Sequence, residues 1–253
     1  MSTISIRNVS SWYGQKKVLD NVNMEIMENE ITAFIGPSAC GKTTLLKSIN
    51  RMNDLIKDFK IEGSIVIEDI DIYKDIIKPV DVMKLRQKIG MVFQSPNPFP
   101  MSIIKNLTLP IEETINDLSD KEVEEIAINS LKSVHLYNEI EDRLTKSALN
   151  ISGGQQQRLS IARCLTISPS IILFDEPCSA LDPISTILIE ELLLELKEKY
   201  TIVIVTHNMQ QARRISDKVG FFYQGELVEF GDSNEFFGSP KEELTQNYLR
   251  GVF

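Results

Sequence analysis

The segment around residues 31–52 constrains the fold of this chain more than any other part of its sequence. Residues 31–35 (ITAFI) form a continuous apolar run, which is typical of a strand buried on both faces in a parallel sheet. GPSACGKT (36–43) follows and fits G-x-x-x-x-G-K-[ST] at every fixed position. Residues 42–52 predict a helix. A strand, a glycine loop and a helix in this order predict a nucleoside triphosphate site in an α/β fold.

The loop itself predicts how phosphate is held. Glycines let the backbone wrap closely around phosphate, while successive N–H groups and the helix N-terminus attract negative charge. In this pattern Lys42 reaches the β- and γ-phosphates and the Thr43 hydroxyl coordinates Mg²⁺. The residues expected to line the nucleotide are Gly36, Pro37, Ser38, Ala39, Cys40, Gly41, Lys42, Thr43 and Thr44.

A second acidic element supplies metal and water chemistry. IILFDE (171–176) predicts a buried strand that ends in two carboxylates, Asp175 and Glu176. Asp175 can hold Mg²⁺ through water, and Glu176 can orient and deprotonate an attacking water. Two carboxylates near one phosphate chain repel it unless a cation is present, so Mg²⁺ is part of the prediction.

The remaining chain mixes strand and helix patterns. Alternating residues at 2–9 and short runs at 62–70 predict antiparallel strands, while 201–205 predicts another buried strand. Between 102 and 150, apolar residues recur at helical spacing and predict a helical insertion. Asp182 followed by Pro183 predicts a capped helix start. Residues 221–229 predict a hairpin that turns at Gln224 and Gly225.

Charge and composition narrow the partners. The net charge is −9 with a pI near 4.9, and there is no basic run, which argues against a nucleic-acid partner. Three cysteines without paired spacing predict free thiols, and zinc is not expected because the two histidines lie apart from them. Apolar runs are strand-sized, so another protein must hold this chain at any membrane.

ISGGQ (151–155) comes after the glycine loop and just before the acidic strand. In this order the motifs resemble those of the ATP-binding subunits of ABC transporters, whose signature usually has leucine at the place of Ile151. The resemblance implies that ATP is the nucleotide and that Ser152, Gly153, Gly154 and Gln155 bind the ATP held by a second copy.

The resemblance also implies roles for isolated residues. Tyr13 stacks on adenine, with Trp12 as the competing candidate and core packing as the alternative for either ring. Gln94 acts in catalysis and as a metal ligand, Asp182 belongs to a loop (179–182) that communicates across a dimer, and His207 contacts the γ-phosphate. Lys42, Gln94, Glu176 and His207 form the implied catalytic set, and Thr43, Gln94 and Asp175 the implied metal set.

For the fold, the resemblance implies a RecA-like P-loop NTPase core with a mixed sheet. An N-terminal antiparallel part and an inserted helical subdomain are joined to it. We expect one ABC ATPase domain over residues 1–253, with its core at about 1–95 and 166–253 and the helical subdomain at about 96–165. Two such cassettes pair head to tail, and ATP hydrolysis lets the pair reopen.

Several longer segments resemble one branch, the ATP-binding subunits of phosphate (Pst) import systems: 50–55, 90–103, 178–186 including Cys178, 207–212 and 221–231. The branch implies a homodimer, two integral membrane permease subunits and an external phosphate-binding protein, with this chain peripheral at the cytoplasmic face of the cell membrane. The proline-rich loop 95–101 either docks a permease through Phe99 and Met101 or keeps Phe99 in its own core.

Alternatives and departures remain open at this point. An importer of another solute, a soluble ABC ATPase and an ATP-binding protein without turnover are the competing functions. Ala39 replaces a common glycine, and a positive φ there implies strain of about 1 kcal/mol or more. Thr43 keeps the hydroxyl of the more usual serine, and nothing explains Arg213 where the branch has a small residue. Cys40, beside a helix N-terminus, is expected to be a reactive thiol that ATP protects.

Overall fold

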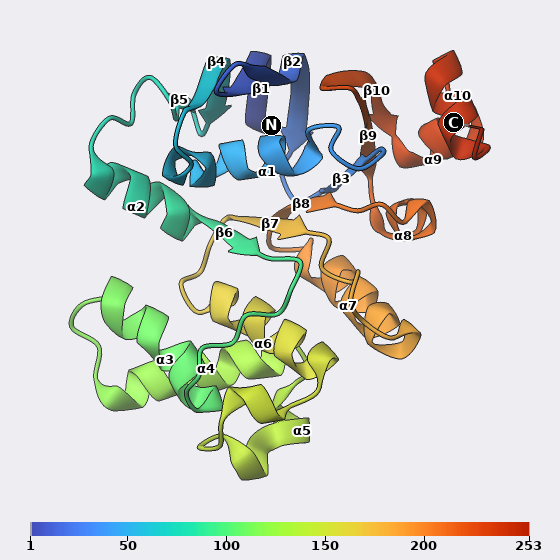
Figure 1. Ribbon diagram of the computed structural model, residues 1–253. Helices are drawn as coiled ribbons and strands as arrows, with labels where there is room; N and C mark the ends of the chain where they lie inside the picture. The colour runs from blue at the N-terminus through green and yellow to red at the C-terminus, as the bar shows by residue number, and fades with distance from the viewer. Residues whose placement is uncertain (1, 253) are drawn as a thin grey trace.

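A four-stranded antiparallel sheet forms the top of the molecule in the computed structural model, which describes residues 2–252 (Figure 1). Its strands lie in the order β2-β1-β4-β5, with bounds Ser2–Tyr13 (β1), Lys16–Met27 (β2), Phe59–Ile67 (β4) and Ile70–Asp71 (β5). Burial alternates along β2, because successive side chains point to opposite faces and only one face meets the core. The predicted antiparallel part is thus present, and its first strand continues beyond residue 9.

A second, six-stranded sheet crosses the middle of the molecule in the order β10-β9-β3-β8-β7-β6. The bounds are Ile31–Ile35 (β3), Ile89–Val92 (β6), Ile171–Asp175 (β7), Thr201–Val205 (β8), Lys218–Tyr223 (β9) and Glu226–Asp232 (β10). All neighbours pair in parallel except β9 and β10, which form the predicted hairpin around Gln224 and Gly225. The predicted mixed sheet is confirmed.

The central strands feed two apolar cores. In β7, Ile172 and Phe174 face the core shared with the helical layer, whereas Ile171 and Leu173 face the core shared with α1 and the antiparallel sheet. All five residues of β3 are buried. A strand covered on both faces reads as a continuous apolar run, which explains why residues 31–35 show no alternation.

The helix after the glycine loop, α1 (Lys42–Ile49), ends earlier than the predicted residue 52. Arg51 adopts a left-handed backbone with φ 58°, which an α-helix cannot continue through. A 3₁₀ turn, η1 (Met52–Leu55), follows, and the Asn50 side chain accepts a hydrogen bond from the Met52 amide. The predicted helix end at residue 52 was therefore wrong: α1 ends at Ile49, and a polar turn follows in place of its last helical turn.

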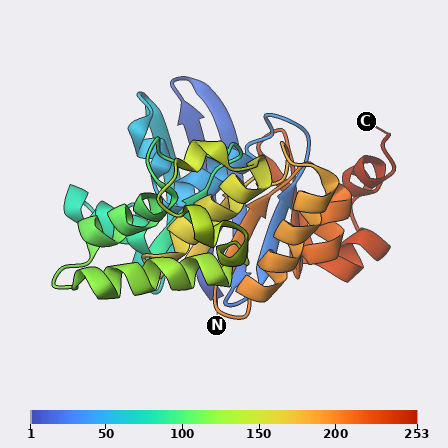
Figure 2. The ribbon, with the colours of Figure 1, turned by 90° about the horizontal axis from the view of Figure 1, so that it is seen from below.

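A layer of helices lies below the central sheet. Its members are α3 (Ile103–Thr114), α4 (Asp120–Ser133), α5 (Tyr137–Ile140) and α6 (Gly153–Leu165), preceded in the chain by α2 (Pro79–Lys88). Val123, Ala127 and Leu131 are buried on one face of α4, as their spacing predicted. The view from below shows this layer, green to yellow, beside α7 and the C-terminal helices, orange to red (Figure 2).

The last part of the chain covers the other end of the sheet with α7 (Pro183–Leu196), α8 (Met209–Ile215), α9 (Ser233–Gly238) and α10 (Glu243–Leu249). The predicted start of α7 is confirmed, since Asp182 caps it and Pro183 is its first residue. The fold class, an α/β core with an antiparallel N-terminal sheet and a helical insertion, is also confirmed. No helix within residues 2–252 has the length and apolar character needed to cross a membrane.

Candidate nucleotide site

The glycine loop lies at the carboxyl end of β3 and leads directly into α1. Gly36 has φ 142°, and a Cβ there would lie 2.1 Å from the Phe222 carbonyl oxygen. Gly41 has φ 106°, and a Cβ there would lie 2.7 Å from a Leu19 methyl group. Only glycine fits either position, because the loop is pressed against β9 and β2. This close packing fixes the backbone conformation of the loop and thereby the directions of its amides.

The Lys42 side chain is folded under the loop. Its Nζ donates to the carbonyl oxygens of Gly36 (2.8 Å) and Pro37 (2.7 Å), and the side chain is buried. Both acceptors are neutral carbonyl groups, so they place the Lys42 side chain without competing as anions for its ammonium. The geometry suits Lys42 for the phosphate contact that the motif predicts.

A hollow of about 490 Å³ lies over the loop. Of the residues predicted for the site, 38–44, Tyr13 and Glu176 line it, whereas Gly36 and Pro37 do not. Lys16, Lys17 and Val18 of β2 and the hairpin turn at Gln224 and Gly225 line it as well and were not predicted. A basic pair three residues after Tyr13 was the visible signal for the lysines. The turn reaches the loop only through the fold, where the Gly225 amide donates to the Cys40 carbonyl at 3.1 Å.

Tyr13 and Trp12 differ in their relation to this hollow. Tyr13 lines it, and its hydroxyl donates to Asn53 Oδ1 at 3.2 Å, while its ring packs against Phe59 with centroids 5.3 Å apart. Trp12 is not among the lining residues and lies under the Lys17 ammonium, 5.6 Å from the ring centroid. The geometry favours Tyr13 for contact with a base, and stacking on adenine remains a prediction.

Asp175 ends β7 beside the start of α1. Its Oδ1 accepts a hydrogen bond from the Thr43 hydroxyl at 2.8 Å, and Lys47 Nζ lies 3.6 Å from Oδ2. Mg²⁺ takes oxygen ligands, usually one or two from protein together with phosphate and water, and this hydroxyl–carboxylate pair fits that donor set. Gln94, the third predicted ligand, is exposed two residues beyond β6, which pairs with β7 and ends at the same sheet edge.

Glu176 and His207 meet at the ends of neighbouring parallel strands. His207 Nδ1 lies 2.9 Å from Glu176 Oε2, and the Glu176 amide donates to the Val205 carbonyl at 2.9 Å. Glu176 has φ 49°, a left-handed conformation that costs a non-glycine residue about 1–2 kcal/mol. Strain of this kind persists where the surroundings over-determine a residue and is frequent at functional sites. It turns the carboxylate out of the strand toward the hollow, where a general base can act.

The predicted signature residues (152–155) lie at the start of α6, outside the hollow over the glycine loop. Ser152 caps α6, and its hydroxyl and the Gln155 side chain form a reciprocal capping box. Gln155 also donates to Glu139 Oε2 at 2.9 Å, an oxygen that Arg158 holds at the same distance. No residue of 152–155 lines the hollow over the glycine loop. Asp182, likewise outside that hollow, accepts from the Ile184 and Ser185 amides as the α7 cap.

Ala39 and Cys40 are the unusual members of the loop. Ala39 has φ 61°, so the left-handed strain expected for that case is present, at about 1–2 kcal/mol. Cys40 is buried and packs in the core around α1, with Lys42 Nζ 3.4 Å from its Sγ. Cys40 is among the residues that line the hollow, but it is only 4% exposed, and this burial argues against the predicted reactivity. Protection of the thiol by ATP stays a prediction. Cys164 and Cys178 are free thiols as well.

The chain matches one family model and several solved structures. The family model described as ABC transporter matches residues 19–179, well over half of the chain. CbiO1 from Clostridium perfringens, part of the ABC transporter complex CbiONQ, is 28% identical, with a TM-score of 0.82 over 98% of this chain and 95% of its own. The bacterial ABC transporter cassette MJ0796, solved as a dimer, is 33% identical, with a TM-score of 0.77 over 91% of this chain and 98% of its own. A second dimeric structure of MJ0796 holds ADP and Pi in a post-hydrolysis state and is 32% identical over the same shares, also with a TM-score of 0.77.

Proposed function

Because this chain belongs to the ABC transporter family, as an ATP-binding cassette, we propose that it hydrolyses ATP as the energy-supplying subunit of a membrane importer. The observation that carries the proposal is one sheet edge where β3, β7 and β8 end. There Lys42 lies beneath the loop, Asp175 accepts from Thr43, and Glu176 meets His207. A phosphate-binding cation, an oxygen pair suited to Mg²⁺ and a general base are the groups that phosphoryl transfer to water requires.

In the proposed reaction a water attacks the γ-phosphorus while the bond from that phosphorus to the ADP oxygen breaks. The Glu176 carboxylate takes the proton of the attacking water. His207, held against Glu176 Oε2, orients that carboxylate and offers its other ring nitrogen to the γ-phosphate. Lys42 stabilises charge on the phosphate oxygens. Thr43 and Asp175, with the predicted ligand Gln94, would hold Mg²⁺, which would neutralise part of the triphosphate charge when bound.

One chain carries two separate half-sites. The signature residues Ser152, Gly153, Gly154 and Gln155 present a capped helix N-terminus, a group that attracts phosphate, but they do not line the loop hollow. We propose that a second copy brings its signature to the ATP of the first, head to tail, with Asp182 and its loop at the contact. Support for a pair of cassettes comes from MJ0796, which is dimeric in both structures and holds ADP and Pi in one of them.

Glu176→Gln tests the dimer and the base together. The variant keeps the loop, so it should bind ATP but not cleave it, and its ATP-bound dimer should persist. Light scattering after size-exclusion chromatography should then give twice the chain mass with saturating ATP and the mass of one chain without it. A Lys42→Ala/Glu176→Gln variant, which loses the phosphate contact, is the matched control and should stay monomeric. A Glu176→Gln chain that stays monomeric with saturating ATP would refute the proposal.

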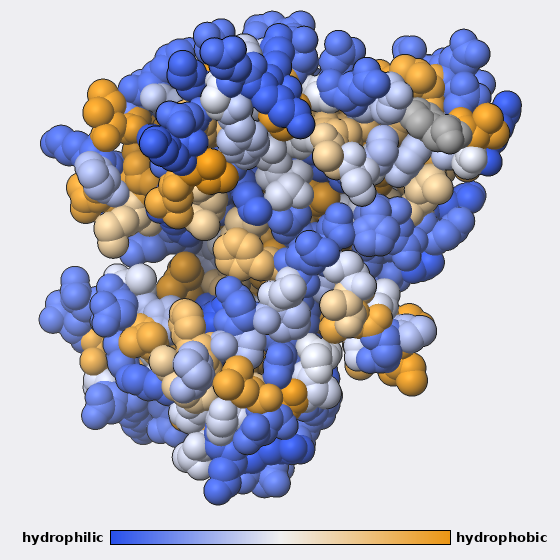
Figure 3. Space-filling model, in the orientation of Figure 1, coloured by the Kyte–Doolittle hydropathy of each residue, from blue (hydrophilic) through white to orange (hydrophobic). Residues whose placement is uncertain are grey.

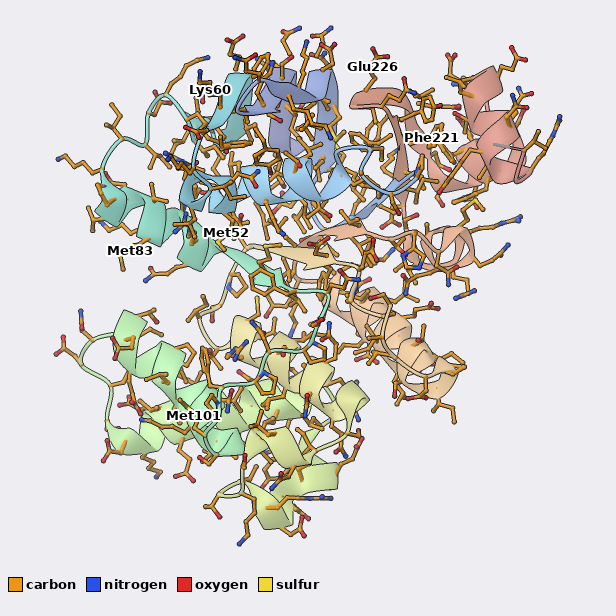
Figure 4. The ribbon with its side chains drawn as sticks, viewed as in Figure 1. Met52, Lys60, Met83, Met101, Phe221 and Glu226 are labelled. Carbon is orange, nitrogen blue, oxygen red and sulfur yellow. The ribbon has the colours of Figure 1, made fainter. Side chains whose placement is uncertain are left out.

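An apolar surface around α2 supports contact with a membrane permease. Leu55, Ile77, Val80 and Met83 are all more than half exposed, and clustered exposed apolar side chains of this kind mark interaction sites. Figure 3 shows apolar atoms (orange) gathered on this side, above a hollow that separates them from the helical layer. In Figure 4, Met52 and Met83 lie at α2, and Met101 lies in the helical layer across that hollow.

The proline-rich loop (residues 95–101) leads from β6 to α3. Phe99 is 39% exposed, and the Arg163 guanidinium covers its ring at 4.4 Å from the centroid. Its backbone is tied to Asn106, which accepts from the Phe99 amide at 2.7 Å. The Phe99 ring is therefore partly buried and partly exposed. Because the backbone of the loop is fixed, the exposed part of the ring is preorganised for contact with a partner helix. We propose that permease subunits dock here, which places the chain at the cytoplasmic face of the membrane as a peripheral subunit.

For the transported solute we propose inorganic phosphate, with two permeases and an external phosphate-binding protein. The support is the resemblance of segments 50–55, 90–103, 178–186, 207–212 and 221–231 to the phosphate-import branch. CbiO1 of the CbiONQ complex, which has a similar fold, stands for the alternative of another solute. Vesicles holding this cassette with the permeases encoded beside it should accumulate labelled phosphate only with ATP and the external binding protein. Uptake of a different solute, with none of phosphate, would reject phosphate while leaving the ATPase intact.

A further inference from the structure

A buried polar cluster lies directly behind His207 and joins α7 to α8. Its members are Thr206, Gln211 and Glu190, each at most 6% exposed, together with the half-exposed Arg214. Arg214 donates twice to the Glu190 carboxylate, at 2.8 Å and 2.7 Å. A carboxylate buried in this way is stable only when it is paired and hydrogen-bonded, and here it is both.

Gln211 is the centre of this cluster because both ends of its amide are used. Its Oε1 accepts from the Thr206 hydroxyl at 2.8 Å, and its Nε2 donates to Glu190 Oε1 at 3.3 Å. Cys178, which precedes the loop before α7, lines the same cleft as Gln211. An amide suits this place because it offers an acceptor to the hydroxyl and donors to the carboxylate.

Residues of this cluster also form hydrogen bonds with both neighbours of His207 in the chain. The Asn208 backbone N–H donates to the Thr206 hydroxyl oxygen at 3.0 Å, and the Gln211 backbone N–H donates to Asn208 Oδ1 at 3.1 Å. The His207 side chain itself is 61% exposed. Its ring is therefore aimed at Glu176 mainly by how its two neighbours are held.

The polar cluster lies at one side of a cleft between α7 and α8. A cleft of about 880 Å³ opens between the two helices, and Glu176, His207, Gln211, Glu190 and Arg214 all line it. Below the cleft, Ile189 and Leu193 of α7 share one apolar core with Ile215 of α8, and Arg214 also bonds Glu190. Gln211 differs from these groups because its side chain bonds both Glu190 of α7 and Thr206, the residue before His207.

We infer that Gln211 is a positioning residue, which holds His207 against Glu176 and links the His207 loop to α7 through Glu190. The inference rests on the proposed function, since it assumes that the Glu176–His207 pair acts in ATP hydrolysis. Because α7 starts at the Asp182 cap, the same link ties His207 to the loop 179–182 that we place at the contact with a second copy.

Gln211→Leu is the direct test, because leucine keeps the approximate volume and removes the amide. Gln210→Leu is the matched control, since Gln210 is the preceding, exposed residue of the same helix. We expect kcat for ATP to fall at least tenfold in Gln211→Leu with KM for ATP within twofold, and Gln210→Leu to match wild type in both. Histidine imidazole NMR gives the structural readout, since the chain has only two histidines and His135 is the internal reference. The His207 resonance should shift in Gln211→Leu while that of His135 does not.

A folded Gln211→Leu chain with wild-type kcat, or with an unshifted His207 resonance, would overturn the inference. If Gln211→Leu does not fold, Thr206→Val carries the same prediction, because it removes the hydroxyl partner and keeps the β-branched shape. A threefold or greater fall in kcat would support the inference, and unchanged kcat would overturn it. Comparing ATP turnover by wild-type and Glu176→Gln chains distinguishes failure of the proposed function from failure of this inference. Equal turnover by these two removes the proposed function and the inference with it, whereas a dead Glu176→Gln beside a fully active Gln211→Leu removes the inference alone.

Discussion

Replacing Gly154 by alanine measures how tightly the signature helix is held against α7. A Cβ at this position would lie 2.4 Å from Ser185 Oγ and 2.8 Å from Ser185 Cβ. The hydroxyl can rotate away, but the Cβ cannot, so α6 and α7 must separate by roughly 1 Å to reach a normal carbon–carbon contact of about 3.8 Å. Overpacking of this size costs about 1–3 kcal/mol, and the better helix propensity of alanine returns up to about 1 kcal/mol. We expect Gly154→Ala to lower the free energy of unfolding by about 1–2 kcal/mol.

The neighbouring glycine provides the control. A Cβ at Gly153 would meet its nearest atom, a Leu181 methyl group, at 3.9 Å, which is ordinary contact. Gly153→Ala should therefore be neutral or stabilising by up to about 1 kcal/mol. Urea unfolding without nucleotide, followed by circular dichroism, gives both values. Adding Ser185→Gly to Gly154→Ala should cost less than the sum of the single changes, because it removes the clashing Cβ. The reasoning fails if Gly154→Ala is as stable as Gly153→Ala.

Two further predictions concern the metal pair and the signature's acidic neighbour. Thr43→Val removes the hydroxyl that bonds Asp175, so the Mg²⁺ concentration for half-maximal ATPase activity should rise about tenfold, equivalent to about 1.4 kcal/mol, while Thr43→Ser stays near wild type. A magnesium titration that gives the same midpoint for both variants would contradict this. The hydrogen bond from Arg158 lowers the pKa of Glu139. The ionised carboxylate therefore stabilises the fold at pH values above the ordinary carboxyl pKa of about 4.3. That stability is lost as pH falls through the lowered pKa. The difference in Tm between wild type and Glu139→Gln should accordingly shrink on acidification below about pH 4, and a gap that stays constant down to about pH 3 would show that the pair does not titrate as argued.

Local features of the fold could be predicted from the sequence. The buried strand 31–35, the loop after it and the hairpin turn at Gln224 and Gly225 were all placed correctly, as was the Asp182–Pro183 helix start. Each depends on backbone conformation and hydrogen bonds within a few residues, so neighbouring residue types carry the signal. The end of α1 was missed because the left-handed turn at Arg51 has no glycine to announce it.

Other parts of the site depended on contacts between distant segments. Lys16 and Lys17 reach the loop hollow because β2 passes behind Gly41, and Tyr13 lines it in preference to Trp12 because of the way β1 faces the loop. The burial of Cys40 likewise follows from packing around α1, and no neighbouring residue indicates it. Strand register and packing bring these groups together, and neither is visible in a local pattern.

The sequence alone determined that the chain has a phosphate loop, two carboxylates after a buried strand and a capped helix at residues 152–155, because each is written in residues next to one another. Tertiary structure decided how these parts combine. Asp175 contacts Thr43 and Glu176 contacts His207 because the parallel strands end at one edge of the sheet. The signature helix, in contrast, does not line the hollow at that edge. Tertiary structure also placed Gln211 beneath His207 through a cluster that spans α7 and α8. Contacts of this range arise only when the whole sheet and its helices have packed, which is why the chain order could not reveal them.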